Sequence, residues 1–119
     1  MTNFDTVARA CILLDMRELV SINGQICDPG QAKISVFDRG FLYGDSVYEV
    51  ARSYGRTLFA IEDHVDRLYS SAEKILMTIP MSKEDMINEL YRIYNTLGIA
   101  DAYLRVVITR GEGPIALDP

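Results

Sequence analysis

The segment DRGFLYGDSVYEVARSYGRTLFAIEDHVDRLYSSAEKILMTIP, residues 38–80, decides the fold. It opens with a glycine-punctuated connection over 38–46, and residues 47–55 then alternate as in a β-strand. A turn at Gly55-Arg56 leads to a second strand over 57–61. The alternation divides the first strand into two faces: Val47, Glu49, Ala51 and Ser53 on one, and Tyr48, Val50, Arg52 and Tyr54 on the other.

Two amphipathic helices are predicted next. The first spans 62–77, and Pro80 prevents its continuation. Ser82 then caps a second helix, with Asp85 at a capping-box-like position, and this helix runs to about Leu97 and stops at Gly98. The buried stripe of the first helix is expected to be Val65, Leu68, Ala72, Ile75 and Leu76.

Outward from this segment, helical spacing predicts a short helix over 5–16, and Asn23-Gly24 predicts a type I′ turn in a hairpin over 20–27. A short strand is expected over 33–37, and a strong strand over 101–109 precedes a loop rich in Gly and Pro. Strands and helices are segregated along the chain. The predicted fold class is therefore α+β, an antiparallel sheet with two main helices packed on one face.

Composition excludes several classes of function. The 119 residues fit one domain, and a net charge of −5 with no basic stripe disfavours a nucleic-acid partner. Nine arginines against three lysines suit a small anionic ligand, although ordinary surface charge explains most of them. Cys11 and Cys27 make neither a disulfide framework nor a zinc site, and no membrane span or signal peptide is visible. We expect a cytoplasmic protein without a metal.

Two groups of side chains could carry chemistry. His64, the only histidine, and Arg67 lie three residues apart on the first helix, where the arginine could bind a phosphate. The alternative is a surface ion pair of Arg67 with Asp63 or Asp66.

The second group lies on two strands. Tyr48 and Arg52 share one strand, and Tyr103 and Arg105 share another. Together they could bind a carboxylate, and the alternative is simple packing of tyrosines on a sheet.

Residues 38–80, with YLRVVITRG at 103–111, resemble the class IV aminotransferases, pyridoxal 5′-phosphate (PLP) enzymes of fold type IV. That family includes branched-chain aminotransferases, D-amino-acid transaminases and aminodeoxychorismate lyases. The resemblance implies that 19–112 form the small domain of such an enzyme. It then leaves 1–18 as an N-terminal helical extension and 113–119 as the start of an interdomain linker, with the large domain absent.

The resemblance also implies site residues. Arg67 in HVDRL matches the arginine that binds the PLP phosphate. The substrate pocket would include Tyr43, Tyr48, Tyr103, Arg105, Ile115 and Leu117. In the branched-chain enzymes the Tyr43 position and the loop of Ile115 and Leu117 reach into the neighbouring subunit's pocket, so a homodimer is implied.

No catalytic residue is assigned, because the family's Schiff-base lysine belongs to a second domain and Lys33, Lys74 and Lys83 match no lysine motif. The intact enzyme would transaminate an amino acid and a 2-oxo acid, whereas the 119-residue chain alone is expected to be inactive and not to retain PLP. The apolar Ile115 and Leu117 favour a branched-chain-like substrate. The alternatives are a D-amino-acid transaminase, an aminodeoxychorismate lyase and a non-catalytic dimerising α+β module.

Overall fold

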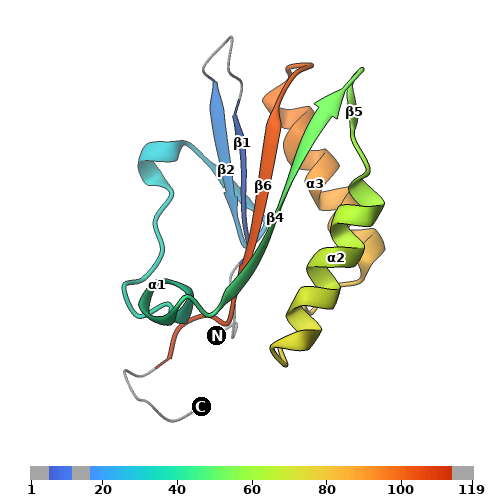
Figure 1. Ribbon diagram of the computed structural model, residues 1–119. Coiled ribbons are helices and arrows are strands. Elements are labelled where there is room, and N and C mark those ends of the chain that lie inside the picture. Colours follow the sequence, from blue (N-terminus) through green and yellow to red (C-terminus); the bar gives the residue numbers. More distant parts are fainter. Residues whose placement is uncertain (1–5, 12–16, 114–119) are drawn as a thin grey trace.

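The computed structural model of the chain describes residues 6–11 and 17–113 (Figure 1). Within them, a 6-stranded sheet runs in the order β3-β2-β1-β6-β4-β5, and each neighbouring pair is antiparallel. The strands are β1 (Thr6–Cys11), β2 (Glu18–Ile22), β3 (Gln25–Cys27), β4 (Ser46–Tyr54), β5 (Thr57–Leu58) and β6 (Tyr103–Thr109). The helices are the 3-10 turn η1 (Pro29–Gln31), α1 (Arg39–Tyr43), α2 (Ile61–Lys74) and α3 (Lys83–Leu97).

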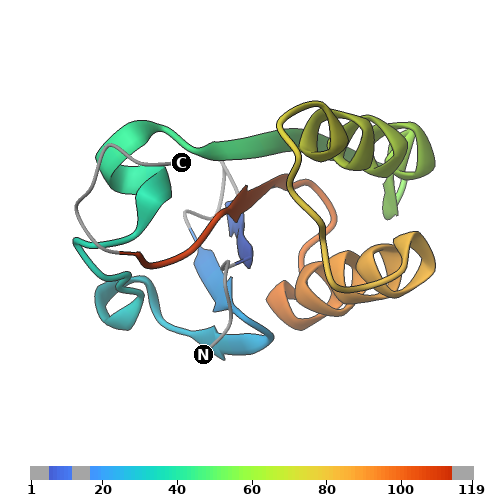
Figure 2. The ribbon, with the colours of Figure 1, turned by 90° about the horizontal axis from the view of Figure 1, so that it is seen from below.

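The two longer helices cover one face of the sheet. Figures 1 and 2 show α2 and α3 side by side on that face, with η1 and α1 on the opposite side. α2 lies against β4, and α3 lies against β1 and β2. The core between helices and sheet includes Leu68, Met86, Leu90, Leu104 and Ile108. The predicted α+β class, with two helices on one face of an antiparallel sheet, is confirmed.

The helix expected over 5–16, and with it the helical character of the extension at 1–18, is wrong over 6–11, whereas residues 1–5 and 12–16 lie outside the described residues. Residues 6–11 form β1, a central strand that pairs with β2 on one side and with β6 on the other. A short apolar run fits helical and strand spacing equally well, so periodicity could not separate them. The two flanking strands decide the matter, because β1 supplies hydrogen-bond partners to both.

The strand expected over 33–37 is also wrong, since this segment leads from η1 to α1 without pairing. Only Asp38 forms an isolated bridge, to Glu112. Alternating side chains make a strand only where a partner is adjacent, and the sheet neighbours of β6 are β1 and β4. The connection over 38–46 instead contains α1, whose N-terminus is capped by the Asp38 carboxylate through Gly40 N at 2.7 Å.

The predicted hairpin turn and the two ends of the second long helix are confirmed. Asn23 and Gly24 have φ values of 52° and 84°, which suit the predicted I′ turn between β2 and β3. The Ser82 hydroxyl accepts a hydrogen bond from Asp85 N at 3.0 Å, and Gly98 ends α3 in the left-handed conformation. α3 therefore begins after Ser82 and ends before Gly98, as the sequence predicts.

The end of α2 differs from its prediction. Ile75 and Leu76 were expected on the buried stripe, yet both are exposed, Leu76 by 89%. α2 ends at Lys74, and Leu76 adopts a φ of 57°, so the two residues leave the helical register. The expected second strand over 57–61 is likewise shortened to β5, because Ala60 turns with a φ of 51° into α2. No helix in the described ranges is long and apolar enough to cross a membrane.

Candidate functional site

Arg67 lies on α2 and makes a two-point ion pair with Glu49 of β4. Its Nε donates to Glu49 Oε2 at 2.9 Å, and its Nη2 donates to Oε1 at 2.7 Å. The alternative from the sequence, a surface ion pair of Arg67 with Asp63 or Asp66, is therefore not the arrangement observed. The pair joins a helix to the strand beneath it, so it is a tertiary contact.

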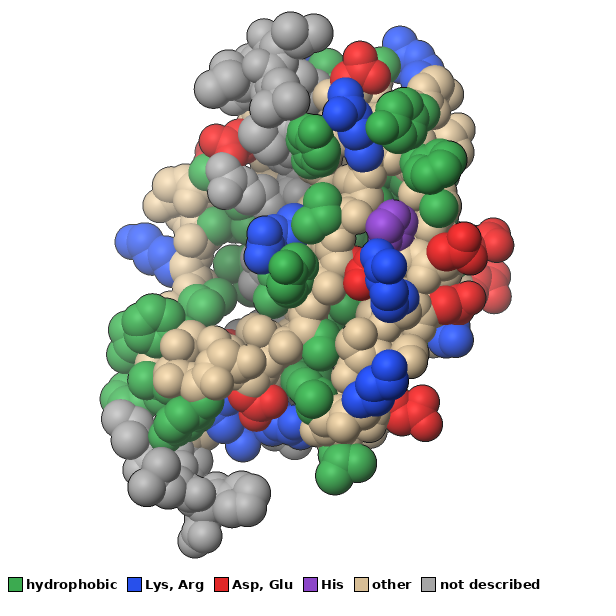
Figure 3. All heavy atoms as spheres, viewed as in Figure 1, with side chains coloured by type: hydrophobic (Ala, Val, Ile, Leu, Met, Phe, Trp, Pro, Cys, Tyr) green, Lys and Arg blue, Asp and Glu red, His purple; other side chains and the backbone are tan. Residues whose placement is uncertain are grey.

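His64 approaches the same carboxylate. Its Nδ1 lies 2.8 Å from Glu49 Oε1. An ionised carboxylate only accepts hydrogen bonds, so Nδ1 carries a proton and donates it. Figure 3 shows the histidine at the surface, with acidic and basic side chains around it.

The pairing changes the acidity of both partners. The hydrogen bond from Arg67 lowers the pKa of Glu49, opposed in part by burial and assisted by the hydrogen bond from His64. The same carboxylate raises the pKa of Arg67. Both side chains are therefore held in their charged forms at neutral pH.

Glu49 is a residue that the sequence analysis missed as part of the site. It was placed on the face of β4 that turns toward the helices, and its side chain is only 10% exposed. A carboxylate at such a position needs a partner, because an unpaired buried charge is costly. The need for a partner was therefore the signal in the sequence that a basic side chain would pack against Glu49, and that side chain is Arg67.

Arg67 keeps donors free for a ligand. Of the five N–H groups of a guanidinium, Glu49 takes two. The Arg67 side chain is 66% exposed, so the outer part of its fork faces solvent. A forked donor of this kind matches phosphate oxygens, and the residues present therefore fit the phosphate group of PLP.

A second cluster occupies the opposite face of β4. Register places Arg105 of β6 opposite Val50, next to Tyr48 along the same face. The Arg105 guanidinium lies 4.3 Å from the centroid of the Tyr48 ring, within cation–π distance. Both residues belong to the candidate carboxylate site predicted from the sequence, and the fold brings them into contact.

Tyr103 has a different partner. Its hydroxyl accepts a hydrogen bond from Arg52 Nη1 at 2.9 Å, and the Arg52 guanidinium lies 5.0 Å from its ring centroid. Arg52 also lies 5.4 Å from the ring of Tyr54. Two arginine–tyrosine clusters thus follow one another along this face, and Tyr103 belongs with Arg52.

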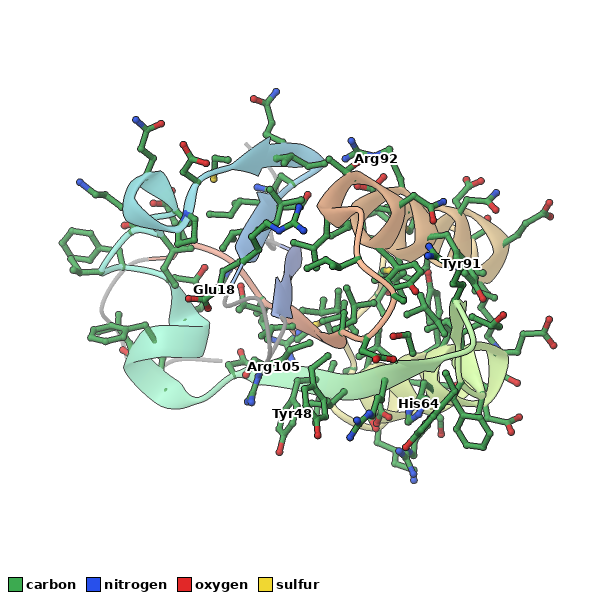
Figure 4. The ribbon with its side chains drawn as sticks, turned by 90° about the horizontal axis from the view of Figure 1, so that it is seen from above. Glu18, Tyr48, His64, Tyr91, Arg92 and Arg105 are labelled. Carbon is green, nitrogen blue, oxygen red and sulfur yellow. The ribbon has the colours of Figure 1, made fainter. Side chains whose placement is uncertain are left out.

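The two faces meet at the outer edge of β4. Within the described part of the chain, β4 pairs with β5 only at Ser53 and Tyr54, so its earlier residues present a free edge. Figure 4, which looks down the strands, shows Tyr48, Arg105 and His64 along the outer side of β4. A ligand at this edge could contact side chains from both faces.

Tyr43 lies at the end of α1, on the other side of the sheet from α2 (Figure 2). α1 is tied to the end of β6: Thr109 Oγ1 donates to Asp38 Oδ2 at 3.0 Å. The Arg39 guanidinium donates to the carbonyl oxygens of Arg110, Gly111 and Glu112. The DRG sequence at 38–40 therefore sets the position of Tyr43 relative to β6. Ile115 and Leu117 lie outside the described residues.

A surface groove near the end of α2 is separate from these clusters. It has a volume of about 570 Å³ and is lined by residues that include Asp66, Tyr69 and Lys83. Lys83 Nζ lies 3.1 Å from Asp66 Oδ1, and burial raises the pKa of Tyr69 to about 12. Of the predicted site residues that the structure describes, none lines the groove. Among the residues described, no group of three His, Cys, Asp or Glu side chains could hold a metal ion.

Comparison with known families identifies the fold. The family model for class IV amino-transferases matches residues 46–119, more than half of the chain. The chain belongs to the class IV aminotransferases. The expected family is thereby confirmed.

Named relatives of this class IV chain fall into two groups. A putative branched-chain-amino-acid aminotransferase from Methanocaldococcus jannaschii is 44% identical over 100 residues, which cover 84% of this chain and 35% of that protein. A D-alanine aminotransferase from Listeria monocytogenes is 39% identical over 94 residues, covering 77% of this chain and 32% of the relative. The chain thus spans about a third of the length of these relatives.

Solved structures of class IV enzymes share the fold. The branched-chain aminotransferase of Escherichia coli superposes with a TM-score of 0.75 at 25% identity, over 82% of this chain and 33% of that one. The branched-chain aminotransferase of Thermoproteus uzoniensis, solved with norvaline, superposes with a TM-score of 0.71 at 26% identity, over 96% of this chain and 36% of that one. The 4-amino-4-deoxychorismate lyase of Pseudomonas aeruginosa superposes with a TM-score of 0.63 at 32% identity, over 74% of this chain and 31% of that one.

Proposed function

We propose that this chain is the small domain of a PLP-dependent enzyme that transfers an amino group between an amino acid and a 2-oxo acid. The observation that carries the proposal is the exposed guanidinium of Arg67, held on α2 by Glu49 with part of its donor set unused. Membership of the class IV aminotransferases supplies the reaction class.

Each cluster has a role in this proposal. Arg67 binds the cofactor phosphate through its outer N–H groups. Tyr48 and Arg105, stacked on the open face of β4 and β6, orient the substrate carboxylate, and Tyr103 and Tyr43 border the pocket. When bound, PLP supplies the electron sink for the transfer. The lysine that carries PLP is expected in polypeptide beyond this chain.

A branched-chain substrate is the preferred assignment. The likeness to the M. jannaschii protein, whose name specifies branched-chain amino acids, supports this assignment. The predicted apolar contacts of Ile115 and Leu117 point the same way, because they suit an aliphatic side chain. A D-amino-acid substrate is the second candidate, since the Listeria relatives are D-alanine aminotransferases.

A homodimer in the cytoplasm completes the proposal. Figure 3 shows hydrophobic side chains gathered over α1, and the exposed apolar residues of this region include Ile34, Val36, Phe37, Phe41 and Tyr43. A surface of this kind on one side of a domain is typical of a subunit interface. It supports a partner subunit whose pocket receives Tyr43.

The test is made on the complete enzyme. We expect PLP absorbance in the purified protein and amino transfer to branched-chain 2-oxo acids. Arg67→Ala should raise the dissociation constant for PLP about tenfold or more, because it removes charge-assisted hydrogen bonds. Transfer from D-alanine in place of L-leucine would favour the second candidate, and pyruvate release without transfer would show a lyase. Unchanged PLP affinity in Arg67→Ala would contradict the assigned phosphate contact.

A further inference from the structure

Arg67 is a long side chain on the surface, and its orientation depends on one carboxylate. The guanidinium is 66% exposed, whereas the Glu49 side chain that holds it is 10% exposed. Two parallel hydrogen bonds fix the plane of the guanidinium, which a single bond would leave free to rotate. Without them, ordering the side chain upon ligand binding would cost rotamer entropy.

Glu49 also orders a second side chain. Its Oε1 accepts from Arg67 Nη2 at 2.7 Å and from His64 Nδ1 at 2.8 Å. The Nδ1 and Nη2 atoms lie 3.4 Å apart. Since Nδ1 donates to the carboxylate, Nε2 is the histidine nitrogen left for another partner. One carboxylate thus sets the orientation of both the guanidinium and the imidazole.

We propose that Glu49 is a positioning residue, which holds Arg67 and His64 in a single arrangement so that their unused nitrogen atoms face one phosphate group. This inference rests on the proposed function, because it assigns Arg67 to the PLP phosphate. Glu49 does not itself contact the ligand. It acts through the two side chains that it orders.

A rival role for Glu49 predicts the opposite change in PLP affinity when the carboxylate is removed. If the carboxylate were only a counter-ion of Arg67, it would compete with the phosphate and repel it, so its removal would strengthen binding. The geometry favours positioning, because the carboxylate lies on the helix-side face of β4 and the exposed part of the guanidinium lies farther out. Glu49 is also seated on a paired strand, opposite the buried Val106 of β6, which makes it a rigid support.

The experiment compares PLP with pyridoxal, which lacks the phosphate, in the complete enzyme. In Glu49→Gln we expect PLP affinity to fall about three- to tenfold, because preorganisation of the guanidinium is lost. Pyridoxal affinity should stay unchanged. Adding Glu49→Gln to the double variant Arg67→Ala/His64→Ala should weaken PLP binding no further, because Glu49 acts only through these two side chains.

The matched control is Glu89→Gln. Glu89 pairs with Arg92 on α3 through the same two-point arrangement, and this pair lies on another element. PLP affinity should not change in this variant. Thermal unfolding of each variant checks folding, and Glu49→Asp, which keeps the charge but shortens the reach, should also lose PLP affinity if Glu49→Gln is unstable.

Three results would overturn the inference: tighter PLP binding in Glu49→Gln, unchanged PLP binding in that variant, or equal losses for PLP and pyridoxal. The proposed function fails separately. If Arg67→Ala binds PLP as well as the parent enzyme, the phosphate assignment is wrong. If Arg67→Ala loses PLP affinity and Glu49→Gln does not, the assignment stands and only the positioning role is rejected.

Discussion

The two faces of the β4–β6 pair differ in what covers them. On the face toward α2 and α3, Leu104 is 1% exposed, while Tyr48 on the opposite face is 56% exposed. The same two strands build both faces through simple alternation. One face supplies the core, and the other presents arginine–tyrosine stacks to a ligand or to neighbouring polypeptide.

Glu49 breaks this division. It is a charged residue on the covered face, near the edge where α2 leaves the strand accessible. Arg67 and His64 come from α2 to meet it, so a polar cluster replaces apolar packing at that point. The candidate phosphate site is therefore built into the helix–sheet interface, whereas the candidate substrate contacts lie outside it.

The largest effect on stability should come from the core of the covered face. Leu68 on α2 is completely buried. Leu68→Ala should lower the free energy of unfolding by about 2–5 kcal/mol, because it removes buried apolar surface and leaves a cavity. Urea denaturation measures this loss. Val50→Ala on the exposed face is the control, and an equal loss there would contradict the division.

A smaller effect is expected at Ser53, a buried polar residue of the same face. Its Oγ donates to Ala100 O at 2.5 Å and accepts from Ala102 N at 2.9 Å. Ser53→Ala should cost about 1–3 kcal/mol, because both backbone groups lose a buried partner. Chemical denaturation of Ser53→Ala beside Ser53→Thr would test it, and a neutral alanine variant would show that water replaces the hydroxyl.

The N-cap of α3 should contribute less again. Ser82→Ala removes the hydrogen bond to Asp85 N and should destabilise the protein by about 1 kcal/mol. Ser82→Asp, which keeps an acceptor at the cap, should recover most of that stability. Thermal melts of both variants measure the difference, and equal melting temperatures would argue against the cap.

On the exposed face, Arg105→Ala should change the free energy of unfolding by less than about 0.5 kcal/mol, because its stacking with Tyr48 is open to solvent. In the complete enzyme we expect the KM for the amino acid to rise about tenfold through the loss of a carboxylate contact. Steady-state kinetics and urea denaturation together test the claim. A large loss of stability with an unchanged KM would show that Arg105 stabilises the fold and does not bind the substrate.

The smallest effect should be a pH-dependent one at Glu49. Its folded-state pKa lies below the usual value of 4.5, so the pair with Arg67 stabilises the fold above that pH. The contribution is lost as pH falls through the lowered pKa. The stability difference between the parent protein and Glu49→Gln should therefore be full at neutral pH and shrink in acid. A difference independent of pH would show that the charge is not involved.

Much of the architecture could be predicted from local signals. The alternation of β4, the Asn23-Gly24 turn and both ends of α3 depend on residues close together in sequence, and all were predicted correctly. These features require little knowledge of what lies across the sheet.

Tertiary contacts decided the rest. The apolar run at 6–11 became β1 because β2 and β6 flank it, and the run at 33–37 remained unpaired because no strand lies beside it. Arg67 pairs with Glu49 and not with its near neighbours in sequence, Asp63 and Asp66, because the packing of α2 on β4 brings Arg67 and Glu49 together. Spacing along the chain determines which face a residue occupies, but hydrogen-bond and ion-pair partners depend on which elements become neighbours in space.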